Sequence, residues 1–345
     1  MVSPWQPGQL LFCGFIGVSP PRSLLDLIAA GRVGGVVLFR RNVENPAQLR
    51  QLCDRLHAAA PPGVPLLLAI DQEGGRVLRL RAPWTAWPAA RALGDRDEPQ
   101  ETASIATAMA RELVELGIRL DFAPVVDVDT NPQNPVIGDR SFGRAPERVA
   151  RHATAFLTAL QEGGVAACAK HFPGHGDTAL DSHLALPRID HDRARIDAVE
   201  LPPFRAAIEA GVASIMTAHV VFAAIDPRAP ATLSPAVMAV LREELGYDGV
   251  VFSDDLEMRA IADFTSVRGR IEGPLRAGVD ALLLCEHADL QEEALRIVER
   301  LPDAAVEAAI TRVVALKRRF AAPRPEPPSG PPYPEHQALA RKLAR

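Results

Sequence analysis

The stretch Val165-Ala166-Ala167-Cys168-Ala169 is followed at once by Lys170-His171-Phe172-Pro173-Gly174-His175-Gly176-Asp177-Thr178 and then by Asp181-Ser182-His183. The first five residues are apolar, as in a buried strand, and the residues after them are mostly polar. Pro173, Gly174 and Gly176 oppose a helix, so this polar run is predicted to be a loop. Polar groups gathered where a strand ends are typical of α/β enzymes.

The same alternation of short apolar runs and longer amphipathic ones recurs along the chain. Eight runs predict strands: Leu10–Gly17, Val33–Phe39, Pro65–Ile70, Arg119–Val128, Val165–Lys170, Ala213–His219, Gly249–Ser253 and Ala281–Cys285. Helical patterns cover Pro46–Ala60, Thr102–Leu116, Glu147–Glu162, Pro202–Ala210, Pro235–Leu245, Gln291–Leu301 and Val306–Phe320. The glycines that follow several of them predict left-handed C-caps, at Gly117, Gly163, Gly211 and Gly246.

Eight strands that alternate with helices predict parallel pairing with helical crossovers. A closed (β/α)8 barrel and an open doubly wound sheet both fit this order. Polar motifs follow the third to the seventh strands, which favours the barrel because it gathers all strand ends at one mouth. We therefore predict an α/β fold, a single-domain (β/α)8 TIM-type barrel over residues 1–321, with a proline-rich C-terminal tail over residues 322–345.

Composition limits the partners of the chain. A formal net charge of −5 over 345 residues argues against nucleic acid, which selects a basic face. Four widely spaced cysteines without a CxxC pair predict reduced thiols of a cytosolic protein. No apolar run reaches membrane-spanning length, and the first residues lack the basic start of a signal peptide. We expect a cytoplasmic protein that binds no membrane.

Candidate functional residues stand at other strand ends as well. Asp71, after the third strand, could accept hydrogen bonds from a polar substrate or form a structural ion pair. Arg140, in the long loop after the fourth strand, could donate to substrate oxygens or pair with Asp139 or Asp127 to hold the loop. His219 ends the sixth strand as a lone histidine, which favours a structural hydrogen-bonding role.

Asp254 and Asp255 end the seventh strand, where an acidic pair is costly unless the site needs it. One carboxylate is well placed as a nucleophile or as a stabiliser of positive charge, and the other could cap the next helix. His171 and His175 have a zinc-like spacing, but Pro173 lies between them and argues against a helical metal site. We expect neither a metal nor a cofactor.

Asp181 and His183 are two residues apart, close enough for a carboxylate to orient an imidazole and raise its basicity. A catalytic triad contains the same carboxylate–imidazole pair together with a nucleophile. No serine or cysteine nucleophile accompanies the pair, and a carboxylate, Asp254, could take that place.

The sequence resembles a known family. The run Lys170–Thr178 with Asp181-Ser182-His183 resembles the signature of bacterial β-N-acetylglucosaminidases (β-hexosaminidases) of glycoside hydrolase family 3. Four further blocks resemble that family in the same order, namely Asp71–Val77, Gly138–Phe142, Met216–His219 and Phe252–Met258. Together the blocks indicate a single-domain member of the family.

The resemblance implies a retaining mechanism. Asp254 would be the nucleophile, and His183, oriented by Asp181, would be the general acid/base. The sugar would be held by Asp71, Arg140, Lys170 and His171, whereas Arg76 and His175 would support loops.

The resemblance also implies a substrate. It is a small carbohydrate, terminal β-linked GlcNAc, taken from GlcNAc-(anhydro)MurNAc fragments of peptidoglycan during cell-wall recycling. Two alternatives stay open at this stage: a phosphorylase or glucosidase of the same family, and a catalytically silent barrel that binds a sugar or a metal.

Overall fold

Eight parallel strands close into a barrel in the computed structural model, which describes residues 5–182, 185–322 and 329–344. The strands are β1 (Leu11–Cys13), β2 (Gly35–Leu38), β3 (Leu67–Ile70), β6 (Leu120–Asp121), β7 (Ala166–Phe172), β9 (Ser214–Thr217), β11 (Val250–Asp255) and β12 (Ala281–Leu284). β12 pairs with β1, with Leu282 opposite Leu11, and this pairing closes the ring. The prediction of a single-domain (β/α)8 barrel is confirmed, and each strand lies inside a predicted apolar run except at the ends of β7 and β11.

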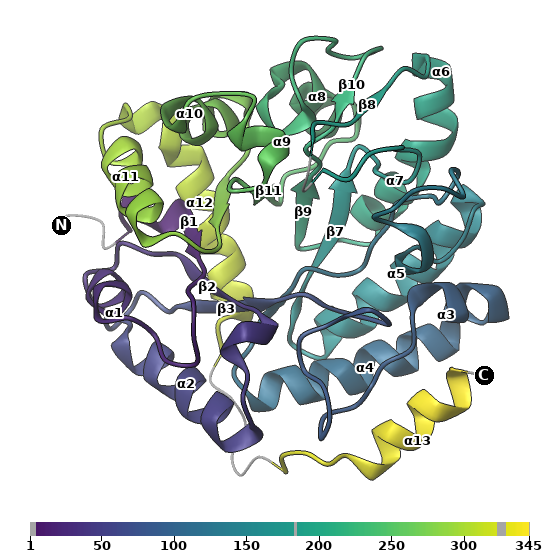
Figure 1. The fold of residues 1–345 in the computed structure, drawn as a ribbon, viewed down its shortest axis with the longest axis horizontal. Helices are drawn as coiled ribbons and strands as arrows, with labels where there is room; N and C mark the ends of the chain where they lie inside the picture. The colour runs from purple at the N-terminus through teal and green to yellow at the C-terminus, as the bar shows by residue number, and fades with distance from the viewer. Residues whose placement is uncertain (1–4, 183–184, 323–328, 345) are drawn as a thin grey trace.

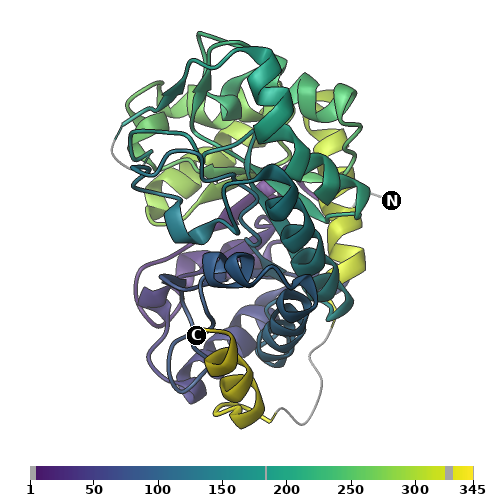
Figure 2. The same ribbon diagram turned by 90° about the vertical axis from the view of Figure 1, so that its right-hand side faces the viewer.

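Helices surround the barrel (Figure 1; Figure 2 gives the side view). They are α1 (Arg22–Ala29), α2 (Pro46–Ala59), α3 (Ala90–Arg96), α4 (Pro99–Glu115), α5 (Pro146–Glu162), α6 (Arg193–Arg195), α7 (Leu201–Glu209), α8 (Pro235–Ala239), α9 (Arg259–Ala262), α10 (Val267–Ala277), α11 (Ala288–Val298), α12 (Asp303–Phe320) and α13 (Pro334–Leu343). Two small ribbons lie outside the barrel, formed by β4 (Gln72–Gly74) with β5 (Val77–Leu78) and by β8 (Arg188–Ile189) with β10 (Val221–Phe222).

Aromatic side chains fill the interior of the barrel. The ring of Phe252 packs edge-to-face against Phe12 at 4.9 Å and against Phe122 at 5.4 Å between centroids. Gly35 is needed beside them, because a Cβ there would lie 2.3 Å from the Phe12 ring. The interior is therefore a packed core, which leaves space for a ligand only at an end of the barrel.

Two local predictions differ from the structure. The left-handed residue after α5 is Gly164, with φ +85°, whereas Gly163 is right-handed and the predicted cap there is wrong. Helix α10 was not predicted, because Gly273 and Pro274 inside it oppose a helical pattern. The chain accepts both residues because α10 packs against its neighbours and buries residues such as Ile271 and Leu275.

The proline-rich segment leads to a helix. Residues 323–328 lie outside the described residues, and α13 follows them and packs against α4. Figure 1 shows α13 beside α4 at the lower right. Residue 321 as the boundary of the barrel stays a prediction.

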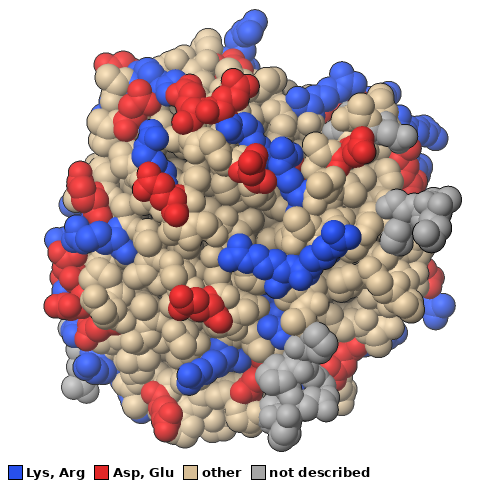
Figure 3. Space-filling model, turned by 180° about the vertical axis from the view of Figure 1, so that it is seen from behind, with Lys and Arg blue, Asp and Glu red and all other residues tan. Residues whose placement is uncertain are grey.

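The cysteines are buried and the surface charges are mixed, as the composition indicates. Cys13, Cys53, Cys168 and Cys285 are buried and free. Positive and negative side chains are mixed over the face in Figure 3. Among the described helices, none is both long enough and apolar enough to cross a bilayer.

Candidate active site

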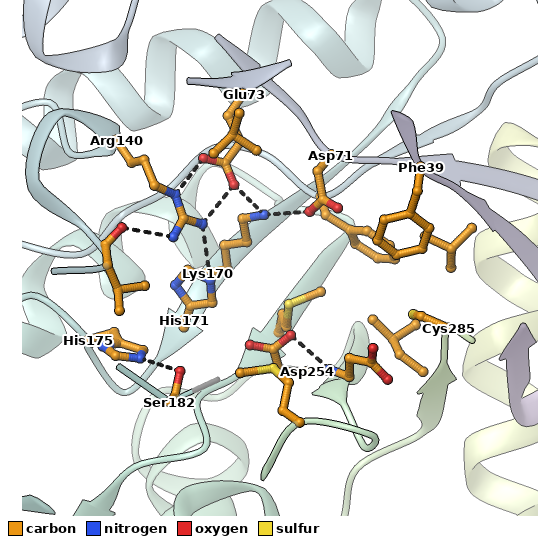
Figure 4. Close-up of a pocket in the computed structure, with 18 of the residues that line it drawn as sticks. Phe39, Asp71, Glu73, Arg140, Lys170, His171, His175, Ser182, Asp254 and Cys285 are labelled. Atoms are coloured by element: carbon orange, nitrogen blue, oxygen red, sulfur yellow. Dashed lines mark hydrogen bonds and ion pairs between the residues drawn. The ribbon is translucent and has the colours of Figure 1, made fainter. Parts of the chain in front are cut away.

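A cavity of about 390 Å³ opens where the strands end, on the side predicted to hold the chemistry. Figure 4 shows this pocket in close-up. Six of the seven predicted site residues line it: Asp71, Arg140, Lys170, His171, Asp181 and Asp254. The seventh, His183, lies outside the described residues. Residues separated by up to 183 positions in the sequence thus meet at one site.

A row of alternating charges forms one wall of the cavity (Figure 4). The Lys170 ammonium lies 2.9 Å from Asp71 Oδ1 and 2.6 Å from Glu73 Oε1. Arg140 donates two hydrogen bonds of 2.8 Å to the Glu73 carboxylate. Asp254 lies on the opposite side of the pocket in the same view. A ligand between them would meet donors and acceptors on one side and a carboxylate on the other.

This row keeps its charges despite burial. Burial raises the pKa of a carboxyl, but Arg140 and Lys170 outweigh it and hold the pKa of Glu73 far below its usual range. Burial lowers the pKa of an ammonium group, but Asp71 and Glu73 outweigh it and raise the pKa of Lys170. The wall is therefore ionised, and its charges compensate one another within hydrogen-bond distance.

Asp127 orients the two histidines of the opening motif. Its Oδ2 accepts from His171 Nδ1 at 2.7 Å, and its Oδ1 accepts from the backbone amides of His171 and His175 at 3.1 and 2.7 Å. Because Nδ1 of His171 is bound in this way, Nε2 is the nitrogen available toward the cavity and toward Arg140, 3.4 Å away. The buried Asp127 thus sets the orientation of a cavity-lining imidazole.

His175 holds the loop that follows β7. Its Nδ1 lies 2.8 Å from Thr178 Oγ1, and its Nε2 lies 3.0 Å from Ser182 Oγ. Burial and the neighbouring His171 lower the pKa of His175 to about 4, so the ring is neutral at pH 7. These contacts support the expected loop-holding role, and they fix the part of the loop that carries Asp181.

Bulges turn consecutive residues toward the pocket at two strand ends. Along β7 and β9, Lys170 pairs with Met216 and Phe172 with Thr217, so β7 contains one extra residue. β11 likewise has one extra residue relative to β12 between Phe252 and Asp255. Side chains normally alternate between the faces of a strand, but a bulge re-aims them. Both members of Lys170-His171 and of Asp254-Asp255 accordingly line the cavity.

The two aspartates at the end of β11 differ in their contacts. The backbone amide of Asp255 donates to Asp254 Oδ1 at 2.8 Å, which fixes the Asp254 carboxylate. Burial, together with the charges of Glu257 and Asp254, raises the pKa of Asp255 to about 7. Asp255 therefore gains a proton more readily than an ordinary aspartate, which reduces the repulsion between the pair. Asp255 does not cap a helix, because α9 begins after Met258 and Asp255 Oδ1 accepts from the Glu257 amide.

His219 has a structural environment, as the sequence favoured. It is fully buried, with Nδ1 2.8 Å from Thr232 Oγ1 and Nε2 3.0 Å from the Asp255 carbonyl oxygen. The carbonyl can only accept, so Nε2 carries the proton. His219 thereby braces the end of β11 beside Asp254.

Sequence reasoning missed three residues of the site. Glu73 lies inside the block Asp71–Val77, in which the sequence indicates no role for it, and it is the shared anion of Lys170 and Arg140. Arg79 lines the cavity and lies 3.1 Å from Asp71 Oδ2. The sequence suggests Asp127 only as a partner of Arg140, whereas in the structure it binds His171. Polar residues just after buried strands were the available signal for Glu73 and Asp127.

The loop-holding pairs proposed for Arg140 do not form. Arg140 binds Glu73, and Asp139 instead accepts from Arg76 Nε at 2.9 Å. Arg76 also donates to the Ile137 carbonyl at 3.0 Å, which supports its expected role in holding this loop. Among the described residues, no group of three His, Cys, Asp or Glu side chains could hold a metal ion.

Comparison with known proteins agrees with this geometry. Residues 7–316 match the family described as glycosyl hydrolase family 3 N terminal domain. The chain belongs to glycosyl hydrolase family 3. The resemblance inferred from the sequence blocks is thus confirmed, and as a member of this family the chain is a glycoside hydrolase.

Members of the family with known names or structures are similar over most of the chain. A β-hexosaminidase of Alkalilimnicola ehrlichii is 45% identical over 300 residues, which are 85% of this chain and 84% of that protein. One of Pseudomonas aeruginosa is 41% identical over 78% of this chain and 80% of its own. A family 3 β-N-acetylglucosaminidase from Paenibacillus sp. FPU-7 superposes with a TM-score of 0.93 at 41% identity, over 99% of this chain and 68% of that one. NagZ from Neisseria gonorrhoeae gives 0.85 at 34% identity, over 99% and 100%.

Proposed function

We propose that this chain is a retaining exo-β-N-acetylglucosaminidase that hydrolyses terminal β-linked GlcNAc through a covalent glycosyl-enzyme on Asp254. The observation that carries the proposal is the position of Asp254 across the cavity from the ionised row that contains Asp71, Lys170 and Arg140 (Figure 4). Sugar hydroxyls both donate and accept hydrogen bonds, and this row offers partners of both kinds. β-Hexosaminidase is the activity in the names of its relatives.

In the first step the Asp254 carboxylate attacks the anomeric carbon while the bond to the leaving oxygen breaks. A general acid gives that oxygen its proton, and we assign this role to His183, oriented by Asp181. Water then attacks the glycosyl-enzyme, the same histidine takes a proton from the water, and Asp254 leaves as a carboxylate. Two inversions restore the β configuration. No cofactor takes part.

The binding roles follow from the contacts in the cavity. Asp71 and Lys170 meet at one end of the row, and Arg140 and His171 meet at the other. We assign these four residues to the hydroxyls and the acetamido group of one sugar. A cavity of about 390 Å³ is near the lower limit for ligand pockets, which suits a single sugar unit and hence attack at a chain end.

The natural substrate that we propose is GlcNAc-(anhydro)MurNAc, with or without a peptide, cleaved in the cytoplasm during cell-wall recycling. The family resemblance and the bacterial relatives support this assignment. A structure of the Neisseria gonorrhoeae relative contains N-trifluoroacetyl-D-glucosamine, a close analogue of the proposed sugar.

The test compares aryl β-GlcNAc with aryl β-glucoside for the wild type, Asp254→Ala and His183→Ala. The wild type should prefer the GlcNAc substrate, and Asp254→Ala should lose several orders of magnitude in kcat with any leaving group. His183→Ala should lose least with an acidic phenol, which leaves without protonation. Equal losses for all leaving groups would remove His183 from the acid role, and sugar 1-phosphate formed with added phosphate would show a phosphorylase.

A further inference from the structure

We propose that the C-terminal segment, residues 329–344, is a positioning element of the sugar pocket. It packs on the outer side of residues 83–89, which we call the tryptophan loop because it contains Trp84 and Trp87. The inner side of that loop contacts the turn that carries Glu73. The function proposed above gives this segment no part, although three layers of contacts connect it to the ionised wall.

The outer layer centres on His336 of α13. Its Nδ1 lies 2.9 Å from Glu112 Oε1 of α4, and the same oxygen accepts from the Thr85 hydroxyl at 2.5 Å. The Glu112 side chain is only 1% exposed, so both hydrogen bonds are shielded from water. The His336 ring also contacts two aromatic rings, stacked on Tyr333 at 5.2 Å and tilted against Trp87 at 5.9 Å between centroids. One side chain of the C-terminal segment thus contacts the tryptophan loop through both a shared carboxylate and a ring.

A second contact fixes the start of the tryptophan loop. Gln337, the next residue of α13, donates from Nε2 to the Pro83 carbonyl at 3.3 Å. The segment before the helix is itself anchored to α4, because Glu115 accepts from the Tyr333 hydroxyl and from the Gly330 amide, both at 2.8 Å. The C-terminal segment is therefore held on α4 on one side and holds the loop on the other. Figure 2 shows it at the base of the molecule, against the helices of the first half of the chain.

The inner side of the tryptophan loop is closely packed against the turn after Glu73, which Gly74 and Gly75 form. The Gly75 amide donates to the Trp87 carbonyl at 2.9 Å. A Cβ on Gly74 would lie 2.2 Å from the Pro88 carbonyl oxygen, and one on Gly75 would lie 2.7 Å from the Ala89 methyl. Both glycines have positive φ, +104° and +57°, so the turn also needs glycine for its backbone. A displacement of the loop would therefore displace the turn.

Glu73 directly precedes this turn and bonds both Lys170 and Arg140. A shift of 1 Å in a group that positions a substrate can cost about 10²-fold in rate. We infer that His336 is a positioning residue that acts through Thr85 and Trp87 on Glu73, and so on the two cations that face the sugar. This inference rests on the proposed function, because its kinetic test measures the hydrolysis of aryl β-GlcNAc.

The experiment compares full-length His336→Ala, His336→Asn and Lys342→Ala. Asparagine keeps a donor near the position of Nδ1. Lys342 lies on the same helix, where its 68%-exposed side chain pairs with Glu101 of α4 and not with the tryptophan loop. His336→Ala should raise KM for aryl β-GlcNAc about tenfold with a smaller change in kcat, and should shift the tryptophan emission to the red. His336→Asn should restore most of the KM, and Lys342→Ala should match the wild type.

A lower Tm in His336→Ala with unchanged KM and unchanged tryptophan emission would show that His336 only stabilises the fold by packing. This result would overturn the proposal. If His336→Ala does not fold, Gln337→Ala, which removes only the bond to Pro83, should shift KM in the same direction, and an unchanged KM there would also overturn it. Calorimetric binding of free N-acetylglucosamine gives the same comparison without catalysis. A wild type without activity would therefore count against the proposed function and not against this positioning role.

Discussion

Glu73→Gln tests whether the ionised wall depends on one buried anion. The Glu73 side chain is 5% exposed and accepts from Lys170 at 2.6 Å and twice from Arg140 at 2.8 Å. Breaking a buried ion pair by removing one partner costs about 3–5 kcal/mol. Glutamine keeps one acceptor oxygen, so we expect the lower end, a loss of about 3 kcal/mol in the free energy of unfolding. Lys170 then keeps Asp71 and Arg140 keeps the Val136 carbonyl, but both lose their shared anion. Because the two cations are held less firmly, kcat/KM for aryl β-GlcNAc should fall about 10²-fold.

The assay pairs urea unfolding with steady-state kinetics, and the chain offers a matched control. Glu272 also accepts from two arginines, Arg268 at 2.6 Å and Arg276 at 3.0 Å, but these side chains are 75% and 68% exposed. The Glu272 side chain is itself 11% exposed, but its partners lie in solvent, where ion pairs contribute about 0–1 kcal/mol. Glu272→Gln should therefore leave the kinetics unchanged and lower the free energy of unfolding by at most about 1 kcal/mol. If Glu73→Gln behaved like Glu272→Gln in both measurements, the reasoning about the buried anion would be refuted.

Three further predictions concern residues around the cavity. His175 has a pKa of about 4 in the folded chain and about 6.5 when unfolded, so between these values the unfolded chain binds the extra proton. The free energy of unfolding therefore falls by about 3 kcal/mol as the pH falls from 6.5 to 4. His175→Gln should flatten this part of the stability–pH curve. An unaltered slope would contradict the assignment. Gly176→Ala places a methyl 1.8 Å from the Val128 carbonyl oxygen and should lower both Tm and activity, whereas Gly143→Ala meets only a flexible arginine side chain and should not. Burial raises the pKa of Asp121, so above pH about 4 the folded chain keeps a proton that the unfolded chain loses, and stability falls as pH rises. Asp121→Asn cannot ionise and should remove this loss. An unchanged slope of the stability–pH curve would contradict the assignment.

The barrel could be predicted because its strands are buried on both faces. Runs such as Val165–Ala169 and Gly249–Phe252 contain no polar alternation, and polar residues mark the ends of the strands. Polar residues after the strands also indicated Asp71, Lys170 and Asp254 as candidate site residues, and the barrel brings these three to one mouth. The order of strands along the chain was sufficient to predict that these residues meet, because all strands of a parallel barrel end on the same side.

The pairing of charges could not be predicted in this way. The sequence suggests Asp139 and Asp127 as partners of Arg140, and all three lie between β6 and β7. The partner in the structure, Glu73, follows β3, so the pairing depends on how these two segments meet in space. The sequence carries no local signal for a contact between residues that follow different strands. The bulge that turns both Lys170 and His171 into the cavity is likewise visible only in the register of the paired strands.

The central claim is that Asp254 becomes covalently attached to the sugar, and mass spectrometry tests it most directly. The enzyme would be quenched in acid during turnover of an aryl β-GlcNAc with a very acidic phenol, in the His183→Ala background, where breakdown of the intermediate is slow. We predict a mass increase of one N-acetylglucosaminyl residue on the peptide that contains Asp254, and none in Asp254→Ala. An unmodified Asp254 peptide during active turnover, or the same adduct on another residue, would contradict the account.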